Sequence, residues 1–374
     1  MTSNVSDPLV SAKPWSVEKA NDWYQQKGWL VGCNYAPSTA VNQLEMWEAD
    51  TFDPDTIDRE LSWAARIGFN SVRVFLHHLL WEHDAQGLRS RMDRFLTIAH
   101  NHGIGVMFVL FDGVWNPCPA AGKRESIPGV HNSGWLQSPG AEILKDLTKH
   151  DSLETYVKGV ISHFACDDRV HVWDIFNEPD NPNLSSYGKL EPPDKAFLSL
   201  ILLKKAFLWA REVQPVQPLT AGVWQGEWTD DSLTALDRFM LNSSDIISFH
   251  NYEAPSEMER RIKILQRFER PVICTEFMAR GKNSTFENNL PLLHDHNVSA
   301  YNWGLVAGKT QTHLPWDAWY NSYTTEPSLW FHDIFRSDGT PYRAEEVDFI
   351  VNFTSSRRRA SRDVSEELMR KTLL

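Results

Sequence analysis

Short apolar runs recur along the chain and are separated by longer segments with helical periodicity. Eight of these runs have the length of a strand and are rich in β-branched, aromatic and other apolar residues. They span residues 29–35, 71–76, 104–111, 171–177, 218–224, 245–251, 271–277 and 299–305. Most are apolar over their length, without regular alternation of apolar and polar positions, which predicts strands buried on both faces.

The segments between the runs predict helices. In residues 54–68, for example, Ile57, Leu61 and Ala64 fall on one helical face, and Gly68 ends the pattern. Helices that alternate with doubly buried strands indicate a parallel α/β sheet, and eight such units predict a closed (β/α)8 TIM barrel. An open, doubly wound sheet is the alternative. It is disfavoured because no phosphate-binding glycine loop follows any of the runs.

The chain can bury one large core, because it has 374 residues of which 42% are hydrophobic. We predict a single barrel domain over residues 1–342, with the barrel itself at about 29–335. Long loops over 112–140 and 179–195 follow the third and fourth strands and would lie at the C-terminal face, where barrel active sites are found. Residues 343–374 predict a short C-terminal helix followed by a charged tail, solvated or disordered.

The overall charge narrows the choice of partners. A formal net charge of −12 repels nucleic-acid phosphates and anionic lipid headgroups, so we expect neither nucleic acid nor a membrane as a partner. The N-terminus lacks the basic and apolar regions of a leader, which predicts a cytoplasmic protein, with secretion as the alternative if a leader has been removed. Nothing in the sequence indicates an oligomeric state.

The cysteines give no sign of a metal site. Cys33, Cys118, Cys166 and Cys274 are far apart in the sequence, with no CxxC pair and no Cys/His ligand spacing. Cys33 and Cys274 lie in apolar runs, which predicts buried, reduced thiols. We therefore expect neither a metal ion nor another cofactor.

Polar residues stand where several predicted strands end, although strand residues in a barrel core are usually apolar. Parallel strands bring their C-terminal ends to the same face of a barrel, so these side chains are expected to meet there. They are Arg73 and His77 at the second strand, Asn177 and Glu178 at the fourth, His250 and Tyr252 at the sixth, Glu276 at the seventh and Trp303 at the eighth.

Two carboxylates in this set suggest a specific chemistry. Burying a carboxylate costs several kcal/mol unless the group is paired or functional, and Glu178 and Glu276 would face each other across the barrel mouth. Two such groups suit displacement at a sugar acetal, where one carboxylic acid protonates the leaving oxygen and one carboxylate attacks the anomeric carbon. The structural alternative is that both glutamates are ion-pair partners of Arg73.

The combined motifs resemble the clan A glycoside hydrolases, and most closely the cellulase-like enzymes of glycoside hydrolase family 5. The resemblance covers about residues 29–335, and its central motif is Asn177-Glu178-Pro179 after the fourth strand. It implies that Glu178 is the general acid/base, that Glu276 is the nucleophile of a retaining double displacement, and that Asn177 binds the sugar 2-hydroxyl.

The resemblance also implies roles for the supporting residues. Arg73 corresponds to the second-strand arginine that keeps the nucleophile ionised. His250 and Tyr252 correspond to a His-x-Tyr pair on the sixth strand, whose tyrosine orients the nucleophile. Trp303 corresponds to the eighth-strand tryptophan under the sugar at the cleaved bond. The expected partner is thus a carbohydrate substrate, an oligosaccharide or glycoside.

These roles require opposite pKa shifts on the two carboxylates. A nearby guanidinium and a tyrosine hydroxyl donor favour the ionised form, so Arg73 and Tyr252 are expected to lower the pKa of Glu276. Apolar neighbours limit hydration, so the pKa of Glu178 is expected to be raised.

One position departs from the family pattern. Many members carry Asp-x-His after the third strand, whereas here Asp112 is followed by Gly113 and Val114. Asp112, Trp115 and Asn116 are candidate substitutes in substrate binding. A loop-capping aspartate and a packed tryptophan are the structural alternatives for Asp112 and Trp115. His77, after the second strand, is a further candidate for substrate binding.

Three functions remain open from the sequence. A retaining β-glycosidase is favoured, and long loops at one end of the cleft would favour exo action on short substrates. A transglycosylase would use the same residues, with a non-water acceptor. A non-catalytic carbohydrate-binding protein is disfavoured because the catalytic set is complete. A metal-dependent hydrolase is disfavoured because the strand-end histidines show no cluster with carboxylates at ligand spacing.

Overall fold

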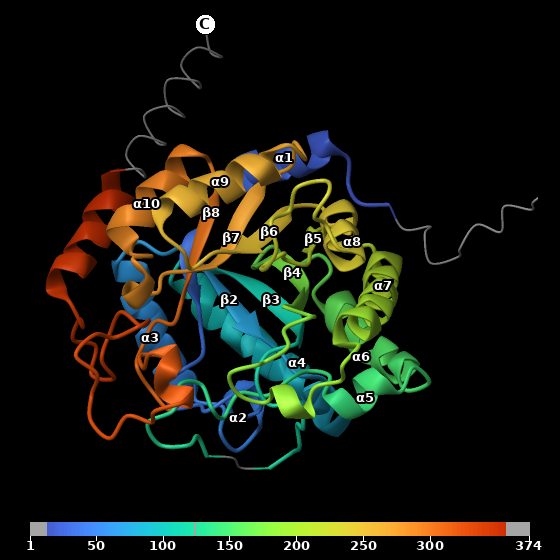
Figure 1. The fold of residues 1–374 in the computed structure, drawn as a ribbon, viewed down its shortest axis with the longest axis horizontal. Helices are drawn as coiled ribbons and strands as arrows, with labels where there is room; N and C mark the ends of the chain where they lie inside the picture. Colours follow the sequence, from blue (N-terminus) through green and yellow to red (C-terminus); the bar gives the residue numbers. More distant parts are fainter. Residues whose placement is uncertain (1–12, 123–124, 357–374) are drawn as a thin grey trace, which may run out of the picture.

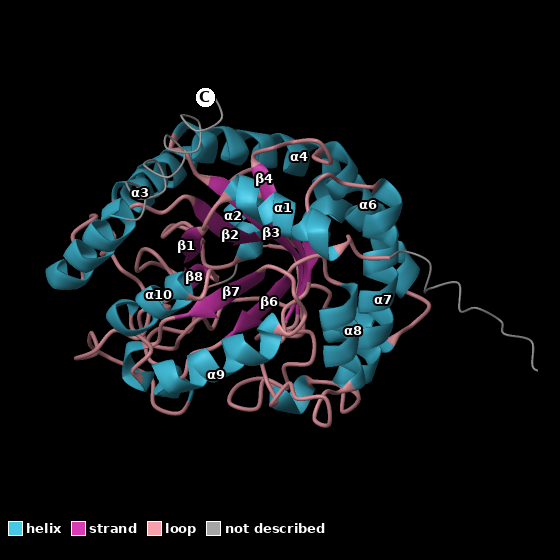
Figure 2. Cartoon of the chain, turned by 90° about the horizontal axis from the view of Figure 1, so that it is seen from above, coloured by secondary structure: helices cyan, strands magenta, loops and turns pink. Residues whose placement is uncertain are grey.

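The strands form a parallel barrel at the centre of the molecule (Figures 1 and 2). The computed structural model describes residues 13–122 and 125–356. Within these residues eight strands pair in the order β5-β4-β3-β2-β1-β8-β7-β6, and every pairing is parallel. Their bounds are β1 (Val31–Asn34), β2 (Ser71–Phe75), β3 (Gly105–Asp112), β4 (Val170–Asn177), β5 (Leu219–Thr220), β6 (Ile247–His250), β7 (Val272–Phe277) and β8 (Ser299–Trp303).

Hydrogen bonds between the segment after β5 and β6 close the barrel. The Val223 N–H donates to the Ser248 carbonyl at 3.1 Å, and the His250 N–H donates to the Val223 carbonyl at 3.0 Å. The (β/α)8 prediction is therefore confirmed. The fifth strand is shorter than the predicted 218–224, because the Ala221 N–H turns to the Ser244 hydroxyl.

Helices surround the strands on all sides in the view from above (Figure 2). Helix α3 shows how the sequence sets them: Asp53 caps its N-terminus through the Thr56 N–H, Pro54 starts it, and Ile57 and Leu61 are buried against the barrel. The helices are α1 (Val17–Lys27), α2 (Gln43–Trp47), α3 (Pro54–Arg66), α4 (His78–Asn101), α5 (Ala141–Lys145), α6 (Glu154–His163), α7 (Lys195–Val213), α8 (Ala235–Ser243), α9 (Pro255–Gln266) and α10 (Phe286–Asp295).

The barrel interior changes from apolar to polar along the strands. Six buried residues from the beginnings of the strands, or just before them, pack into one apolar cluster: Leu30, Met107, Val172, Ile246, Ile273 and Tyr301. Nearer the C-terminal ends the interior holds Arg73, Asp174 and Asn177, which are all buried. The apolar cluster fills the N-terminal side of the interior, so solvent and ligands reach the polar side chains from the C-terminal face. Cys33 and Cys274 are buried thiols, as predicted.

A long segment after β8 folds back over the C-terminal face and is tied to the barrel by Arg280. Its guanidinium donates to the carbonyls of Trp330, His332 and Asp333 and pairs with buried Glu346. Glu346 belongs to a helix over 344–356. The charged tail predicted beyond that helix lies outside the described residues.

No helix among residues 13–122 and 125–356 combines the length and the apolar character needed to cross a membrane.

Candidate active site

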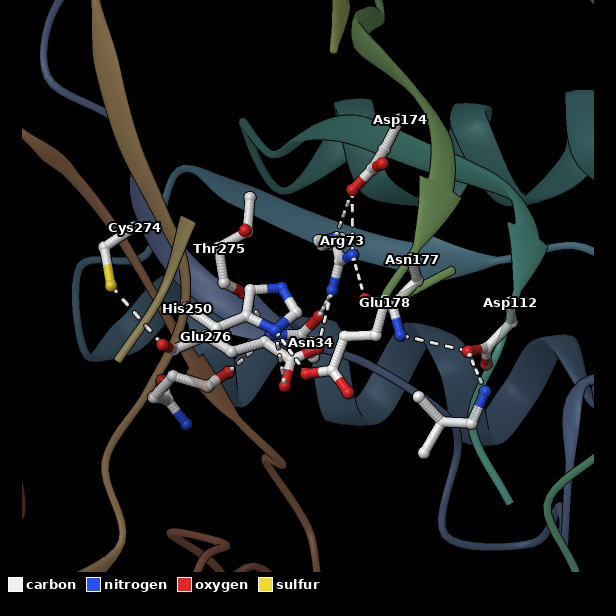
Figure 3. Close-up of polar contacts among 12 residues, drawn as sticks. Asn34, Arg73, Asp112, Asp174, Asn177, Glu178, His250, Cys274, Thr275 and Glu276 are labelled. Carbon is white, nitrogen blue, oxygen red and sulfur yellow. Dashed lines mark hydrogen bonds and ion pairs between the residues drawn. The ribbon is translucent and has the colours of Figure 1, made fainter. Parts of the chain in front are cut away.

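Arg73 is the centre of the polar interior (Figure 3). Its side chain is buried, and its guanidinium donates five hydrogen bonds. Two go to one oxygen of Asp174, at 3.0 and 2.8 Å, and one goes to Glu276 at 2.9 Å. The others reach the side-chain oxygens of Asn34 and Asn177, both at 2.7 Å. A guanidinium has five N–H donors, so every one is used and the group cannot rotate without losing a bond.

The strand register brings these groups to one level of the barrel. Asn34 of β1 pairs with Arg73 of β2, and His250 of β6 pairs with Glu276 of β7. The β6–β7 ladder is irregular just before His250, and such irregularities can re-aim side chains at a barrel rim. Glu178 follows β4 with a φ of 40°. This left-handed backbone is uncommon outside glycine and ends the extended strand abruptly.

Glu276 lies in a charged setting. Oε1 accepts from Arg73, while Oε2 accepts from the Tyr252 hydroxyl at 2.6 Å and lies 3.6 Å from His250 Nδ1. Burial raises the pKa of this carboxyl above its usual range, against the lowering effects of His250, Arg73 and Tyr252. The predicted net lowering is therefore wrong, because removing the carboxylate from water outweighs its favourable contacts.

Glu178 has neutral partners instead. Oε1 lies 2.6 Å from His250 Nδ1, and Oε2 accepts from the Asn181 amide at 2.6 Å. Burial raises the pKa of Glu178 to about 7, in the predicted direction. Burial also lowers the pKa of His250 to about 4, so the imidazole is neutral at pH 7. Since only Glu276 touches a cation, the geometry favours the proton on Glu178 and the charge on Glu276.

The two carboxylates are close together. A ligand atom of Glu178, one of His250 and one of Glu276 all lie within 4.8 Å of one another. The expectation that no strand-end histidine clusters with carboxylates is therefore wrong, since a set of this composition can coordinate a metal ion. However, the Arg73 guanidinium already supplies a positive charge 2.9 Å from Glu276 and would repel a cation held there.

Asp112 lies beside this pair and holds other residues in position. Its carboxylate accepts from the Asn177 amide at 3.0 Å and the Trp135 indole at 2.6 Å, and also from Gln43 and the Val114 N–H. Because Asn177 turns its oxygen to Arg73 and its nitrogen to Asp112, its amide orientation is fixed. Burial raises the pKa of Asp112 to about 6.

These residues line a cavity of about 500 Å³ at the C-terminal face. Of the predicted site residues, Glu178, Glu276, Asn177, Tyr252, Trp303, Asp112 and Trp115 line it. Arg73 and His250 lie beneath and contact the carboxylates. The structure places His77 elsewhere. It is buried, caps α4 by accepting the Leu79 N–H, and bonds to the Gln137 carbonyl.

Sequence reasoning missed several residues of the site. Asn34 ends β1, and Asp174 is the acidic residue within the apolar run of β4, so both carried the strand-end or buried-polar signal used for the others. Asn181, His131, Asn132 and His332 lie in loops, and no local pattern marks them. Only the folded loops show that these four line the cavity.

Comparison with known proteins gives a structural result. No protein-family model and no curated protein matches the sequence. A variant of GH5_18 from Streptomyces cattleya, solved in complex with Manb1-4GlcNAc, aligns with a TM-score of 0.60 and 14% identity, over 89% of this chain and 81% of that one. Exo-beta-1,4-mannosidase Op5Man5 from Opitutaceae bacterium strain TAV5 aligns with 0.60 and 18%, over 89% and 60%.

A third solved structure aligns with a lower TM-score. The beta-1,4-mannanase from the sea hare Aplysia kurodai aligns with a TM-score of 0.53 and 16% identity, over 74% of this chain and 87% of that one. At these identities the comparisons establish a shared fold.

Replacing Arg73 by methionine tests whether this guanidinium holds the interior together. Arg73→Met should lower the free energy of unfolding by about 3–5 kcal/mol, because Asp174 and Glu276 lose their buried cation. Urea denaturation at pH 7 measures the change. Lys263→Met is the matched control, since it breaks the exposed pair with Glu259 and should change stability by less than about 0.5 kcal/mol. A loss below about 1 kcal/mol for Arg73→Met would contradict the central role of Arg73.

Proposed function

We propose that this protein is a retaining β-glycosidase of glycoside hydrolase clan A, related to family 5. The observation that carries the proposal is the pair of buried carboxylates, Glu178 and Glu276, with oxygens within 4.8 Å of each other. Retaining glycosidases hold their carboxyl groups about 5–5.5 Å apart, whereas inverting enzymes leave about 6.5–9.5 Å for a water molecule. The short spacing here supports the retaining class over the inverting one.

In the first step Glu276 attacks the sugar. Its carboxylate oxygen forms a bond to the anomeric carbon while the bond from that carbon to the leaving oxygen breaks. Glu178, which holds the proton, donates it to the leaving oxygen so that a neutral alcohol departs. Arg73 and the Tyr252 hydroxyl, bonded to opposite oxygens of Glu276, orient the attacking group.

In the second step Glu178 acts as a base instead of an acid. With Glu276 esterified and neutral, the electrostatic penalty on a charged Glu178 falls, and Glu178 is left ionised after the first step. It accepts a proton from water, the water oxygen bonds to the anomeric carbon, and the ester bond to Glu276 breaks. His250 contacts both carboxylates and is neutral. It therefore adds no positive charge beside Glu178 that would favour loss of the Glu178 proton.

The substrate class follows from the walls of the site. Trp303 and Trp135 offer aromatic surface, and Asn177 offers a fixed amide, which together suit the C–H faces and hydroxyls of a pyranose. Three structurally similar proteins are named for action on β-linked mannose or were solved with it, and a fourth is named as a beta-glucosidase. We therefore propose β-mannosides, followed by β-glucosides, as the first substrates to test.

Two alanine variants test the catalytic assignment on an aryl β-glycoside with a good leaving group. Glu276→Ala should reduce turnover to background, because no ester can form. Glu178→Ala should still form the ester, should release it about 10²- to 10⁴-fold more slowly, and should be rescued by azide, which needs no base. Chromophore release and NMR of the products measure both effects.

Partly exposed Glu259 supplies the control, since it lies on α9 away from the cavity and Glu259→Ala should behave as wild type. Unchanged turnover in either catalytic variant would contradict the catalytic role assigned to the substituted glutamate. Capture of the sugar by an added alcohol in preference to water would instead identify a transglycosylase, which uses the same residues.

The pH dependence tests which carboxyl carries the proton. Activity requires Glu178 protonated, so kcat/KM should fall as pH rises through its pKa of about 7. Activity also requires Glu276 ionised, so the acid limb should lie above the ordinary glutamate pKa, because burial raises that of Glu276. In Glu178→Gln, assayed with an activated aryl glycoside, the alkaline limb should disappear. If it persists, another group is the acid.

A further inference from the structure

The cavity is buried at one end and open at the other. His131, Asn132, Trp135 and His332 form the closed end, and each is at most 4% exposed. Leu184, Ser185 and Gln225 form the open end, where Leu184 is 84% exposed. The four residues of the closed end come from the loops after β3 and β8, and those of the open end from the loops after β4 and β5. The loop after β8 also supplies Tyr320, which is 71% exposed at the rim of the cavity.

Hydrogen bonds join the two loops of the closed end. The Asn132 N–H donates to the Thr310 carbonyl at 2.9 Å, and His131 Nδ1 lies 2.8 Å from the Leu314 carbonyl. The Gln311 amide bonds to the carbonyls of Ile127 and Val130. In Figure 1 the two loops, drawn in green and orange, come together at the lower left. They therefore form one continuous wall.

Further contacts extend this wall on both sides. The loop after β1 is attached by the Lys309 N–H, which donates to the Ser38 carbonyl at 3.0 Å. On the other side the indole rings of Trp115 and Trp319 stack at 5.2 Å with 11° between their planes, and Tyr187 from the loop after β4 packs edge-on against Trp319. Together these contacts close the path that a longer glycan would need beyond the closed end.

The closed end also holds polar groups without protein partners. His332 Nδ1 lies 2.6 Å from the Met278 carbonyl, so it must donate its proton and leave Nε2 as an acceptor. Neither that Nε2 nor either amide atom of Asn132 has a partner among the described residues. Leaving such groups unpaired costs about 1–3 kcal/mol each, and because Asn132 and His332 line the cavity these groups are candidate partners for the hydroxyls of a ligand.

The catalytic residues give the direction of the substrate. Glu178 protonates the leaving oxygen, and it lies on the side of the open end, where its loop supplies Asn181 and Leu184. The leaving group therefore points towards the open end. Trp303 contacts Trp135 of the closed end, with ring centroids 6.0 Å apart, so we place the sugar attacked by Glu276 on Trp303, next to the closed end.

Given the proposed function, on which this inference rests, we propose that the enzyme is exo-acting. It releases one β-linked sugar at a time from the non-reducing end of its substrate. The closed end binds that terminal sugar, with Asn132 and His332 contacting its hydroxyls.

The test compares the aryl β-monoglycoside of the preferred sugar with the aryl β-1,4-disaccharide of the same sugar. An exo enzyme cleaves the monoglycoside directly, but the disaccharide must first lose its terminal sugar, so monosaccharide and aryl monoglycoside appear before the free aryl alcohol. Mass spectrometry of early time points shows which products are released first. Early release of intact disaccharide together with the aryl alcohol would overturn the inference and leave the glycosidase proposal standing. No turnover of any aryl glycoside would instead refute the proposed function.

A glycine variant tests the role of Asn132. This residue has a φ of 47°, which glycine adopts freely, so Asn132→Gly removes the amide without straining the backbone. It should lower kcat/KM on the monoglycoside about 2- to 10-fold, the effect of losing one neutral hydrogen bond. Asn297→Gly is the matched control, with a φ of 55° on an exposed loop before β8, at the other end of the barrel. Equal kcat/KM in both variants, at equal thermal stability, would contradict a role for Asn132 in sugar binding.

Discussion

The site depends on one buried guanidinium whose donors are all used. Arg73 bonds to residues from β1, β4 and β7, so it links opposite sides of the barrel at a single level. A charge buried this deeply is tolerated because Asp174 and Glu276 surround it. Burying either carboxylate without this guanidinium would cost more free energy. The same contacts fix Asn177 and, through it, Asp112. Stability and chemistry therefore rest on the same set of bonds.

The two glutamates differ by their neighbours rather than by their burial. Both are removed from water, which raises both pKa values, yet Glu276 contacts Arg73 and Glu178 contacts neutral groups. One proton shared by the pair is therefore favoured on Glu178. Under the proposed function, this division supplies the acid and the nucleophile that a double displacement at an acetal requires at one pH. In the proposed exo mode of action, the closed and open ends of the cavity determine which part of a substrate meets each glutamate.

The features that could be predicted from the sequence are those set by the periodicity of apolar residues. The residues that were missed are mostly those positioned by long loops. Apolar runs located all eight strands. Polar residues near the ends of predicted strands, the strand-end rule, pointed to Glu178, Glu276 and Arg73, because parallel strands bring such residues to one face. The rule misplaced His77, since a histidine after a strand can cap the following helix instead. Asn132 and His332 were not found, because their positions depend on long loops joined by tertiary hydrogen bonds. The direction of the Glu276 pKa shift was also mispredicted, because the contacts with Arg73 and Tyr252 were considered and the removal of this carboxylate from water was not.

Trapping the covalent intermediate tests the central claim most directly. A 2-deoxy-2-fluoro glycoside with an activated leaving group slows both steps, so the glycosyl-enzyme should accumulate as a single adduct, detectable by mass spectrometry. Peptide mapping should place the sugar on Glu276, and Glu276→Ala should form no adduct. An adduct on another residue, or turnover with inverted product and no adduct, would contradict the account.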